Sequence, residues 1–157
     1  MNFRIDEQGD PDSLPAEVRK GIRESDPPDV GLRDWQAVHI ALRSDDGSVV
    51  GGVYGATMWE WLMIDGLWVS PSLRGQGFGR QLLLAAESVA IARGCRGSRL
   101  GTFDFQARDF YQNHGYGVYG ELPGFPRGHT HYHLFKNFES SAFTADDAPA
   151  QLLHIAP

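Results

Sequence analysis

The chain has 157 residues and a mass of 17.4 kDa, the size of one ordinary domain. Its hydrophobic fraction of 41% and charged fraction of 22% are typical of a chain that buries a core, which excludes wholesale disorder. Fourteen basic residues against twenty acidic residues give a net charge of −6. This balance argues against a nucleic-acid-binding protein, because such proteins present a basic face.

The N-terminal third is predicted to hold a short strand, a helix and a hairpin. Residues 3–5 form the candidate strand, and residues 13–24 form the candidate helix, whose apolar side chains recur every four positions. Apolar and polar residues then alternate over residues 38–42, and a glycine-punctuated apolar stretch follows at 49–57. The Asp-Asp-Gly turn between these two stretches predicts an antiparallel hairpin.

The rest of the chain alternates strands with helices. A strand is predicted at residues 59–69, and a long helix begins at Gly77 and ends near Gly94, where a C-terminal cap is expected. The later predicted elements are a strand at 100–103, a helix at 107–114, and strands at 118–122 and 131–138. This order predicts a mixed α/β single domain over residues 1–138. Residues 139–157 are predicted to form a C-terminal tail of unknown role.

The location of the protein is predicted to be cytoplasmic. Cys95 is the only cysteine, so the chain has no internal disulfide framework, and we expect this residue to be small, buried and apolar. The longest apolar run is too short to cross a bilayer. The first residues lack the charged head and apolar stretch of a signal peptide.

A glycine-rich turn links the strand at 59–69 to the long helix. Its residues, called the glycine turn below, are Arg74, Gly75, Gln76, Gly77, Phe78, Gly79 and Arg80. Glycines at alternate positions let the backbone approach a ligand and turn its N–H groups inward, and a helix N-terminus favours phosphate. The flanking arginines add charge-assisted hydrogen bonds. The turn is predicted to bind a phosphate-containing anion; the alternative is a tight turn that only permits close helix–strand packing.

The spacing of this turn excludes the two common nucleotide motifs. A P-loop needs a lysine directly after its last glycine, and no lysine lies near the turn. A dinucleotide fingerprint needs glycines spaced by two and then three residues, whereas these glycines are spaced by two and two.

Two motifs together resemble those of the GNAT family of N-acetyltransferases. The arginine and the second and third glycines of the glycine turn have the spacing of the family's acyl-CoA pyrophosphate motif. The second motif follows in the family's order, in Ala107, Phe110, Tyr111, Gly115 and Tyr116. The resemblance covers roughly residues 3–138. It implies a mixed, mostly antiparallel central sheet of about six or seven strands flanked by helices.

The resemblance also implies how a cofactor is held. The backbone amides of the glycine turn would bind the pyrophosphate of acetyl-CoA, and the backbone of Leu67, Trp68 and Val69 would pair with its pantetheine arm. An amide near Val69 would polarise the acetyl carbonyl. Tyr111 falls on the family's tyrosine position, where a phenol protonates the departing thiolate. A plain core aromatic is the alternative role for Tyr111.

Asp65 is the candidate base that would deprotonate the attacking amine. It lies two residues before Leu67, so strict alternation would place both side chains on one face of the strand, near the acetyl group. A water chain acting as the base is one alternative, and a surface or turn role for Asp65 before Gly66 is another.

The acceptor-binding residues are predicted only loosely. Trp59 and Trp61 could face a cationic amine, with Glu60 between them, although alternate tryptophans also pack cores and dimer contacts. His129 and Tyr132, which belong to a histidine-rich stretch, could reach the acceptor pocket. Three histidines there could share a strand face, but no metal is predicted, because the chemistry needs none and no carboxylate or cysteine is adjacent in sequence.

The predicted function is transfer of the acetyl group from acetyl-CoA directly to a primary amine of a small molecule, such as an antibiotic, a polyamine or an amino-acid derivative. A protein lysine or N-terminal acetyltransferase and a non-catalytic acyl-CoA-binding module are the alternatives. Neither nucleic acid nor membrane is expected as a partner. Similar proteins are often homodimers, so a homodimer is possible here.

Overall fold

The computed structural model describes Ile5 and residues 9–138. The predicted strand at residues 3–5 and the predicted tail at 139–157 therefore lie outside the described residues, apart from Ile5, which belongs to no strand. Contacts divide the chain into two compact units, Met1–Leu32 and Arg33–Pro157. The single domain over residues 1–138 stays a prediction.

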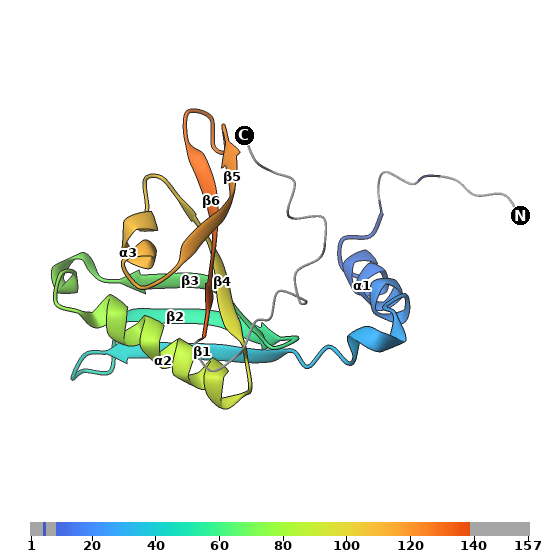
Figure 1. Cartoon of the computed structure of the whole chain (residues 1–157), viewed down its shortest axis with the longest axis horizontal. Coiled ribbons are helices and arrows are strands. Elements are labelled where there is room, and N and C mark those ends of the chain that lie inside the picture. Colours follow the sequence, from blue (N-terminus) through green and yellow to red (C-terminus); the bar gives the residue numbers. More distant parts are fainter. Residues whose placement is uncertain (1–4, 6–8, 139–157) are drawn as a thin grey trace, which may run out of the picture. The chain divides into compact units, whose positions relative to one another are not determined.

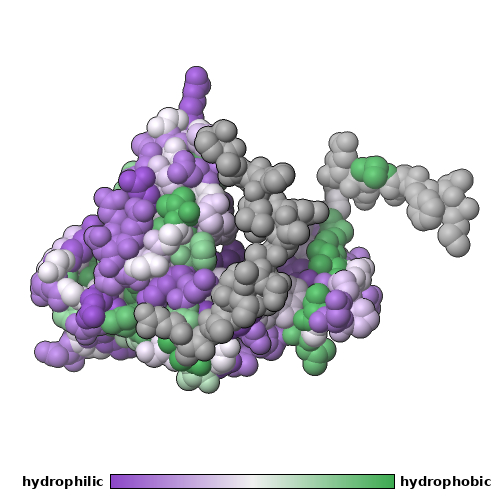
Figure 2. All heavy atoms as spheres, in the orientation of Figure 1, coloured by the Kyte–Doolittle hydropathy of each residue, from purple (hydrophilic) through white to green (hydrophobic). Residues whose placement is uncertain are grey.

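The first unit contains the predicted amphipathic helix, α1 (Leu14–Glu24), followed by a short 3-10 turn, η1 (Pro28–Val30). The apolar stripe is exposed: Leu14, Val18 and Ile22 keep 45–51% of their surface accessible, and apolar side chains are visible on this helix in Figure 2. Ser13 precedes the helix but makes no side-chain cap hydrogen bond. No helix among residues 9–138 is both long and apolar enough to cross a membrane.

The second unit is built on a mixed sheet with six strands among the described residues, which confirms the predicted α/β fold (Figure 1). The strands are β1 (Gln36–Arg43), β2 (Val49–Met58), β3 (Trp61–Val69), β4 (Gly97–Phe103), β5 (Gly117–Pro123) and β6 (Thr130–Asn137). Their order is β1-β2-β3-β4-β6-β5. All neighbours are antiparallel except β3 and β4, which are parallel because the crossover helix α2 (Phe78–Ala92) joins them.

Helices cover one face of this sheet. Helix α2 buries its apolar stripe, which includes Leu83, Ala86 and Ala90 at 0% exposure, against β1, β2 and β3. The core on this face also takes in Tyr111 from the short helix α3 (Arg108–Gln112). The positive φ of 81° at Gly94 allows the chain to leave α2, as the sequence predicts.

Strand β3 begins two residues later than the sequence predicts. Trp59 and Glu60 adopt left-handed backbone angles, with φ of 49° and 60°, so they form the turn between β2 and β3 instead of its first residues. Tertiary contacts overcome the unfavourable backbone angles. The Asp34 carboxylate accepts a hydrogen bond from the Trp59 amide at 2.8 Å, and Arg96 pairs with the Glu60 carboxylate at 2.9 Å.

Strand β3 also carries a bulge at Asp65. Two consecutive residues of β2, Tyr54 and Gly55, pair with residues of β3 that are two apart, so Asp65 is an extra residue. Asp65 is exposed, whereas Leu67 packs against the core. The expectation that these two side chains share a face is therefore wrong, because it rested on unbroken alternation.

A buried charge pair ties α2 to the sheet. Glu87 of α2 is 5% exposed, and its carboxylate accepts hydrogen bonds from the Tyr116 hydroxyl at 3.0 Å and from Lys136 Nζ at 2.7 Å. Burial raises the pKa of the Tyr116 phenol far above its ordinary value, so this hydroxyl stays a donor. The three side chains join α2, β6 and the segment before β5.

We expect Lys136→Met to destabilise the fold by about 3 kcal/mol, because it leaves the Glu87 carboxylate buried without its cation. Urea unfolding at neutral pH measures this loss. Lys20→Met is the matched control: Lys20 pairs with Glu24 at 3.7 Å on the exposed face of α1, and its loss should cost at most about 0.5 kcal/mol. Equal losses in the two variants would contradict a structural role for the buried pair.

Candidate functional site

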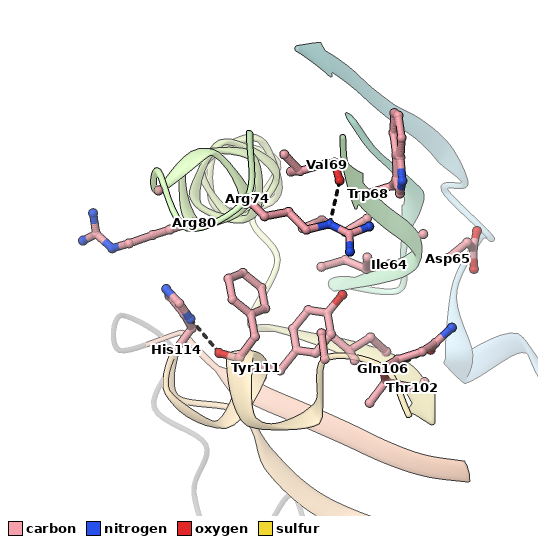
Figure 3. Close-up of a pocket in the computed structure, with 18 of the residues that line it drawn as sticks. Ile64, Asp65, Trp68, Val69, Arg74, Arg80, Thr102, Gln106, Tyr111 and His114 are labelled. Carbon is pink, nitrogen blue, oxygen red and sulfur yellow. Dashed lines mark hydrogen bonds between the residues drawn. The ribbon is translucent and has the colours of Figure 1, made fainter. Parts of the chain in front are cut away.

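A cavity of about 830 Å³ lies where β3 and β4 separate. The two strands pair only over residues 61–64 of β3 and 97–100 of β4. Beyond that point β3 lines the cavity from residue 65 to residue 69, and residues 66–69 are paired with β2 on the other side. The glycine turn, the end of β4 and the chain from Phe105 through α3 form the remaining walls (Figure 3). An extended ligand could therefore add to the free edge of β3 as a further strand would.

The glycine turn has the geometry of an anion site. Gly75 and Gly77 have φ of 75° and 85°, and a Cβ atom at either position would meet no atom within 4 Å. Gly77 is the N-cap of α2, so the amides of the first helical turn, from Phe78 onward, have no intrahelical acceptor. Positive φ, open space and free amides at one point suit a phosphate group. The close-packing alternative applies only to Gly79, where a Cβ atom would lie 3.5 Å from the Phe110 ring.

Two arginines add positive charge to this cavity. Arg74 extends into it, and its Nε donates a hydrogen bond to the Val69 carbonyl oxygen at 3.1 Å (Figure 3). Arg80, in the first turn of α2, also lines the cavity and extends outward. The chain as a whole carries a net charge of −6, so the two arginines make this cavity locally more positive than the rest of the protein.

Tyr111 projects from α3 into the same cavity. Its side chain is 7% exposed and packs edge-on against Phe110, with ring centroids 5.1 Å apart. Figure 3 shows the ring pointing from α3 towards β3. Burial raises the pKa of the Tyr111 phenol, so the hydroxyl keeps its proton at neutral pH and can donate it. Tyr111 is therefore both a core residue and a residue that faces the cavity.

The predicted cofactor and base residues on β3 lie along the cavity. Leu67, Trp68 and Val69 line it, and so does Asp65. The Asp65 carboxylate is directed away from the Tyr111 ring (Figure 3). Its role as the base stays a prediction, now without the alternation argument that supported it.

Three polar side chains of the cavity were not predicted from the sequence: Thr102, Gln106 and His114. The Thr102 hydroxyl donates to Gln106 Oε1 at 3.2 Å, and His114 Nδ1 donates to the Phe110 carbonyl oxygen at 2.7 Å. Gln106 and His114 directly adjoin residues of the second motif, and this adjacency was a signal that the sequence did contain.

The tryptophan segment lies away from the cavity. Trp59 and Glu60 form the β2–β3 turn, and Trp61 begins the parallel pairing with β4, where its ring packs 6.5 Å from that of Phe135. None of the three lines the cavity, so the structure does not bring them together with Tyr111. Their predicted part in acceptor binding therefore has no support from the geometry.

The other two acceptor candidates lie just behind the cavity wall. His129 precedes β6, with Nδ1 3.0 Å from the Asp104 carboxylate and its ring edge-on to Phe105, a residue that lines the cavity. Tyr132 of β6 lies under the Arg108 guanidinium at 4.9 Å. Both side chains support the wall, and neither is part of it.

The described residues form neither a three-ligand metal site nor a reactive thiol. Within residues 9–138, no three His, Cys, Asp or Glu side chains come together as metal ligands. Cys95 is buried, as the sequence predicts, and burial raises the pKa of its thiol, which disfavours the reactive thiolate.

Known proteins are similar to this chain in sequence and in fold. A model of the acetyltransferase (GNAT) family matches residues 10–116. The chain is 43% identical over 91 residues to a blasticidin-S acetyltransferase of Streptomyces morookaense, covering 57% of this chain and 67% of that protein. It is 35% identical over 144 residues to the acetyltransferase Atu2258 of Agrobacterium fabrum, covering 88% and 100% of the two chains.

Solved structures agree with this assignment. The crystal structure of an acetyltransferase from Bacillus cereus superimposes with a TM-score of 0.75 at 30% identity, over 88% of this chain and 98% of that one. Family match, relatives and fold all point to one kind of enzyme. The chain belongs to the GNAT family of acetyltransferases and is an acyl-CoA-dependent acetyltransferase.

Proposed function

We propose that the protein transfers the acetyl group of acetyl-CoA directly to a primary amine of a small molecule. One observation carries this proposal: the free edge of β3 leads into the glycine turn, and the Tyr111 hydroxyl faces the same cavity. The three features suit the three parts of acetyl-CoA, which are an extended pantetheine arm, a pyrophosphate and a thiol leaving group.

The residues of the cavity divide the work of binding. The first-turn amides of α2 and the flanking Arg74 and Arg80 hold the pyrophosphate, and Gly75 and Gly77 leave the space that it needs. The edge of β3 at Leu67, Trp68 and Val69 aligns the pantetheine arm. Bound in this way, acetyl-CoA supplies an activated thioester at the point where β3 and β4 separate.

Tyr111 acts as the general acid. Transfer breaks the bond between the acetyl carbon and sulfur, and the sulfur leaves with the electron pair. The raised pKa of Tyr111 keeps the phenol protonated until the thiolate can take its proton. A main-chain amide near Val69 is the donor that polarises the acetyl carbonyl, a single-donor oxyanion site. The sequence predicts Asp65 as the base, but its carboxylate is directed away from the Tyr111 ring (Figure 3).

An antibiotic amine is the acceptor class that the relatives favour. The Streptomyces morookaense relative, at 43% identity, is named for blasticidin S. The cytoplasm stays the predicted location. A homodimer stays the predicted assembly, and size-exclusion chromatography with light scattering would test it.

The test of this function is release of free CoA thiol from acetyl-CoA across a panel of amines. The panel contains blasticidin S, nourseothricin, an aminoglycoside, spermidine, lysine and a lysine-containing basic peptide. We expect turnover with one chemical group of small amines. Turnover confined to the peptide would contradict the small-molecule acceptor. No turnover with any amine, while acetyl-CoA still raises the melting temperature, would contradict the proposed transfer to a small-molecule amine.

A further inference from the structure

A histidine ring lies against β4 at the point where this strand leaves β3. A Cβ atom on Gly101 would lie 2.7 Å from His131 Nε2, so only glycine leaves room for the ring here. Gly101 directly follows Leu100, the last residue of β4 that pairs with β3, and it lines the cavity. The imidazole of His131 thus lies against Gly101, a residue of the cavity wall, without lining the cavity itself.

His131 lies on the opposite face of the sheet from the glycine turn and Tyr111. On β6, Leu134 and Lys136 face α2, through the core and the Glu87 pair, and His131, His133 and Phe135 alternate to the other face. The helix-covered face holds the donor-binding residues of the cavity. Acetyl-CoA held by these residues would occupy that side, which would leave the face of His131 as the route by which an amine reaches the acetyl group.

The surroundings of His131 are mainly aromatic. Its ring centroid lies 4.6 Å from Phe103, 4.6 Å from His133 and 5.9 Å from Phe125. Burial first, and then the charge of His133, lower the pKa of His131, so the imidazole is neutral at pH 7 and able to accept a proton.

Charged groups near this ring are few in the part of the chain that the structure describes. On β6 the titratable neighbour is His133, and β4 places Arg99 on the same face, two residues before Gly101. Strand β5 presents Leu122 and Gly120 opposite the two histidines. The loop that precedes β6 carries Arg127 and His129, and His129 pairs with Asp104.

We propose that His131 is the general base of the acetyl transfer, accepting through Nε2 the proton of the incoming ammonium group. This inference rests on the proposed function. The ammonium nitrogen gives one proton to His131, and its lone pair forms the bond to the acetyl carbon. The carbon–sulfur bond breaks, and sulfur takes the Tyr111 proton. The nitrogen loses its second proton to water, His131 releases its proton to water and Tyr111 regains one, so each turnover releases one proton.

The test compares pH profiles of kcat/KM for the panel amine that the wild type turns over fastest. The wild type should lose activity as pH falls through the lowered pKa of His131, because the protonated ring cannot accept a proton. We expect His131→Gln to lower the plateau about 100-fold. Its remaining rate should rise with pH up to the pKa of the amine itself. The dissociation constant of acetyl-CoA should stay within about twofold, since the ring lies on the other face of the sheet.

Two controls separate this role from a structural one. His39→Gln, on the exposed surface of β1, should leave the whole profile unchanged. His133→Gln should keep the plateau within about threefold and move the acid limb to higher pH, because it removes a positive neighbour of His131. If His131→Gln fails to bind acetyl-CoA, His131→Ala is assayed with added imidazole, and a rate that imidazole does not raise overturns the proposal.

Three results would overturn the assignment. A full plateau and an unchanged acid limb in His131→Gln would remove His131 while leaving the proposed function intact. If Asp65→Asn loses the acid limb of the kcat/KM profile while His131→Gln keeps the wild-type profile, the base is Asp65. No turnover of any panel amine by the wild type would remove the proposed function and this inference with it.

Discussion

Gly77→Val is expected to weaken acetyl-CoA binding by at least about 100-fold, which is about 2.7 kcal/mol of binding free energy. Gly77 has a φ of 85° and caps α2, and the space in front of it holds no protein atom within 4 Å. A branched side chain would fill the space proposed for the pyrophosphate and strain the turn that orients the amides. Isothermal titration with acetyl-CoA measures the change.

Gly47→Val is the matched control for this prediction. Gly47 has a φ of 87°, and a Cβ atom there would meet no atom within 4 Å, as at Gly77, but it lies in the turn between β1 and β2. Both variants should therefore lose a similar stability, about 1–2 kcal/mol from the left-handed backbone. Only Gly77→Val should lose affinity. Equal affinity losses in the two variants would place the anion site somewhere other than the glycine turn.

Tyr111→Phe is expected to lower kcat by about 10²- to 10⁴-fold, the usual contribution of a general acid. The change removes one oxygen from a ring that is otherwise held by Phe110 and the core, so the cavity keeps its shape. In the wild type, the alkaline limb of kcat should lie above the ordinary tyrosine pKa, because burial raises the pKa of Tyr111 and an acid acts only below its pKa. The variant should show no such limb.

Tyr116→Phe controls for loss of a buried tyrosine hydroxyl. Tyr116 packs edge-on against Tyr111, with ring centroids 5.8 Å apart, and donates to Glu87, but it does not line the cavity. Its loss should lower the melting temperature and keep kcat within about threefold. Acetyl-CoA affinity should be unchanged in both variants. A Tyr111→Phe enzyme with wild-type kcat would show that another group protonates the thiolate.

Most elements of the second unit could be predicted from local patterns. The hairpin, the long helix and the glycine turn were predicted from residues that are close together in sequence. The patterns are the alternation of apolar and polar residues, an apolar stripe at helical spacing, and glycines at fixed spacing. The buried stripe of α2 and the positive φ values of Gly77 and Gly94 follow from those patterns. Two motifs at a family-like separation then indicated the kind of enzyme.

The features that could not be predicted depend on contacts distant in sequence. The bulge at Asp65 accompanies a close approach of β2, where a side chain on Gly55 would overlap the Met63 carbonyl. The turn at Trp59 takes an unfavourable backbone angle and is held by Asp34, 25 residues away. The position of His131 depends on its strand pairing beside β4, which no pattern within β6 reveals.

The segment between β3 and α2 should tolerate an insertion less well than the β1–β2 turn. Ser70 bonds back to Val50, Arg74 bonds back to Val69, and Gly77 accepts the first helical hydrogen bond, so the segment's length is held at three points. An insertion there would shift the helix start relative to the strand edge. The exposed turn at Gly47 has no such restraint from the site, which makes it the place for an affinity tag or a fluorescent label within the chain.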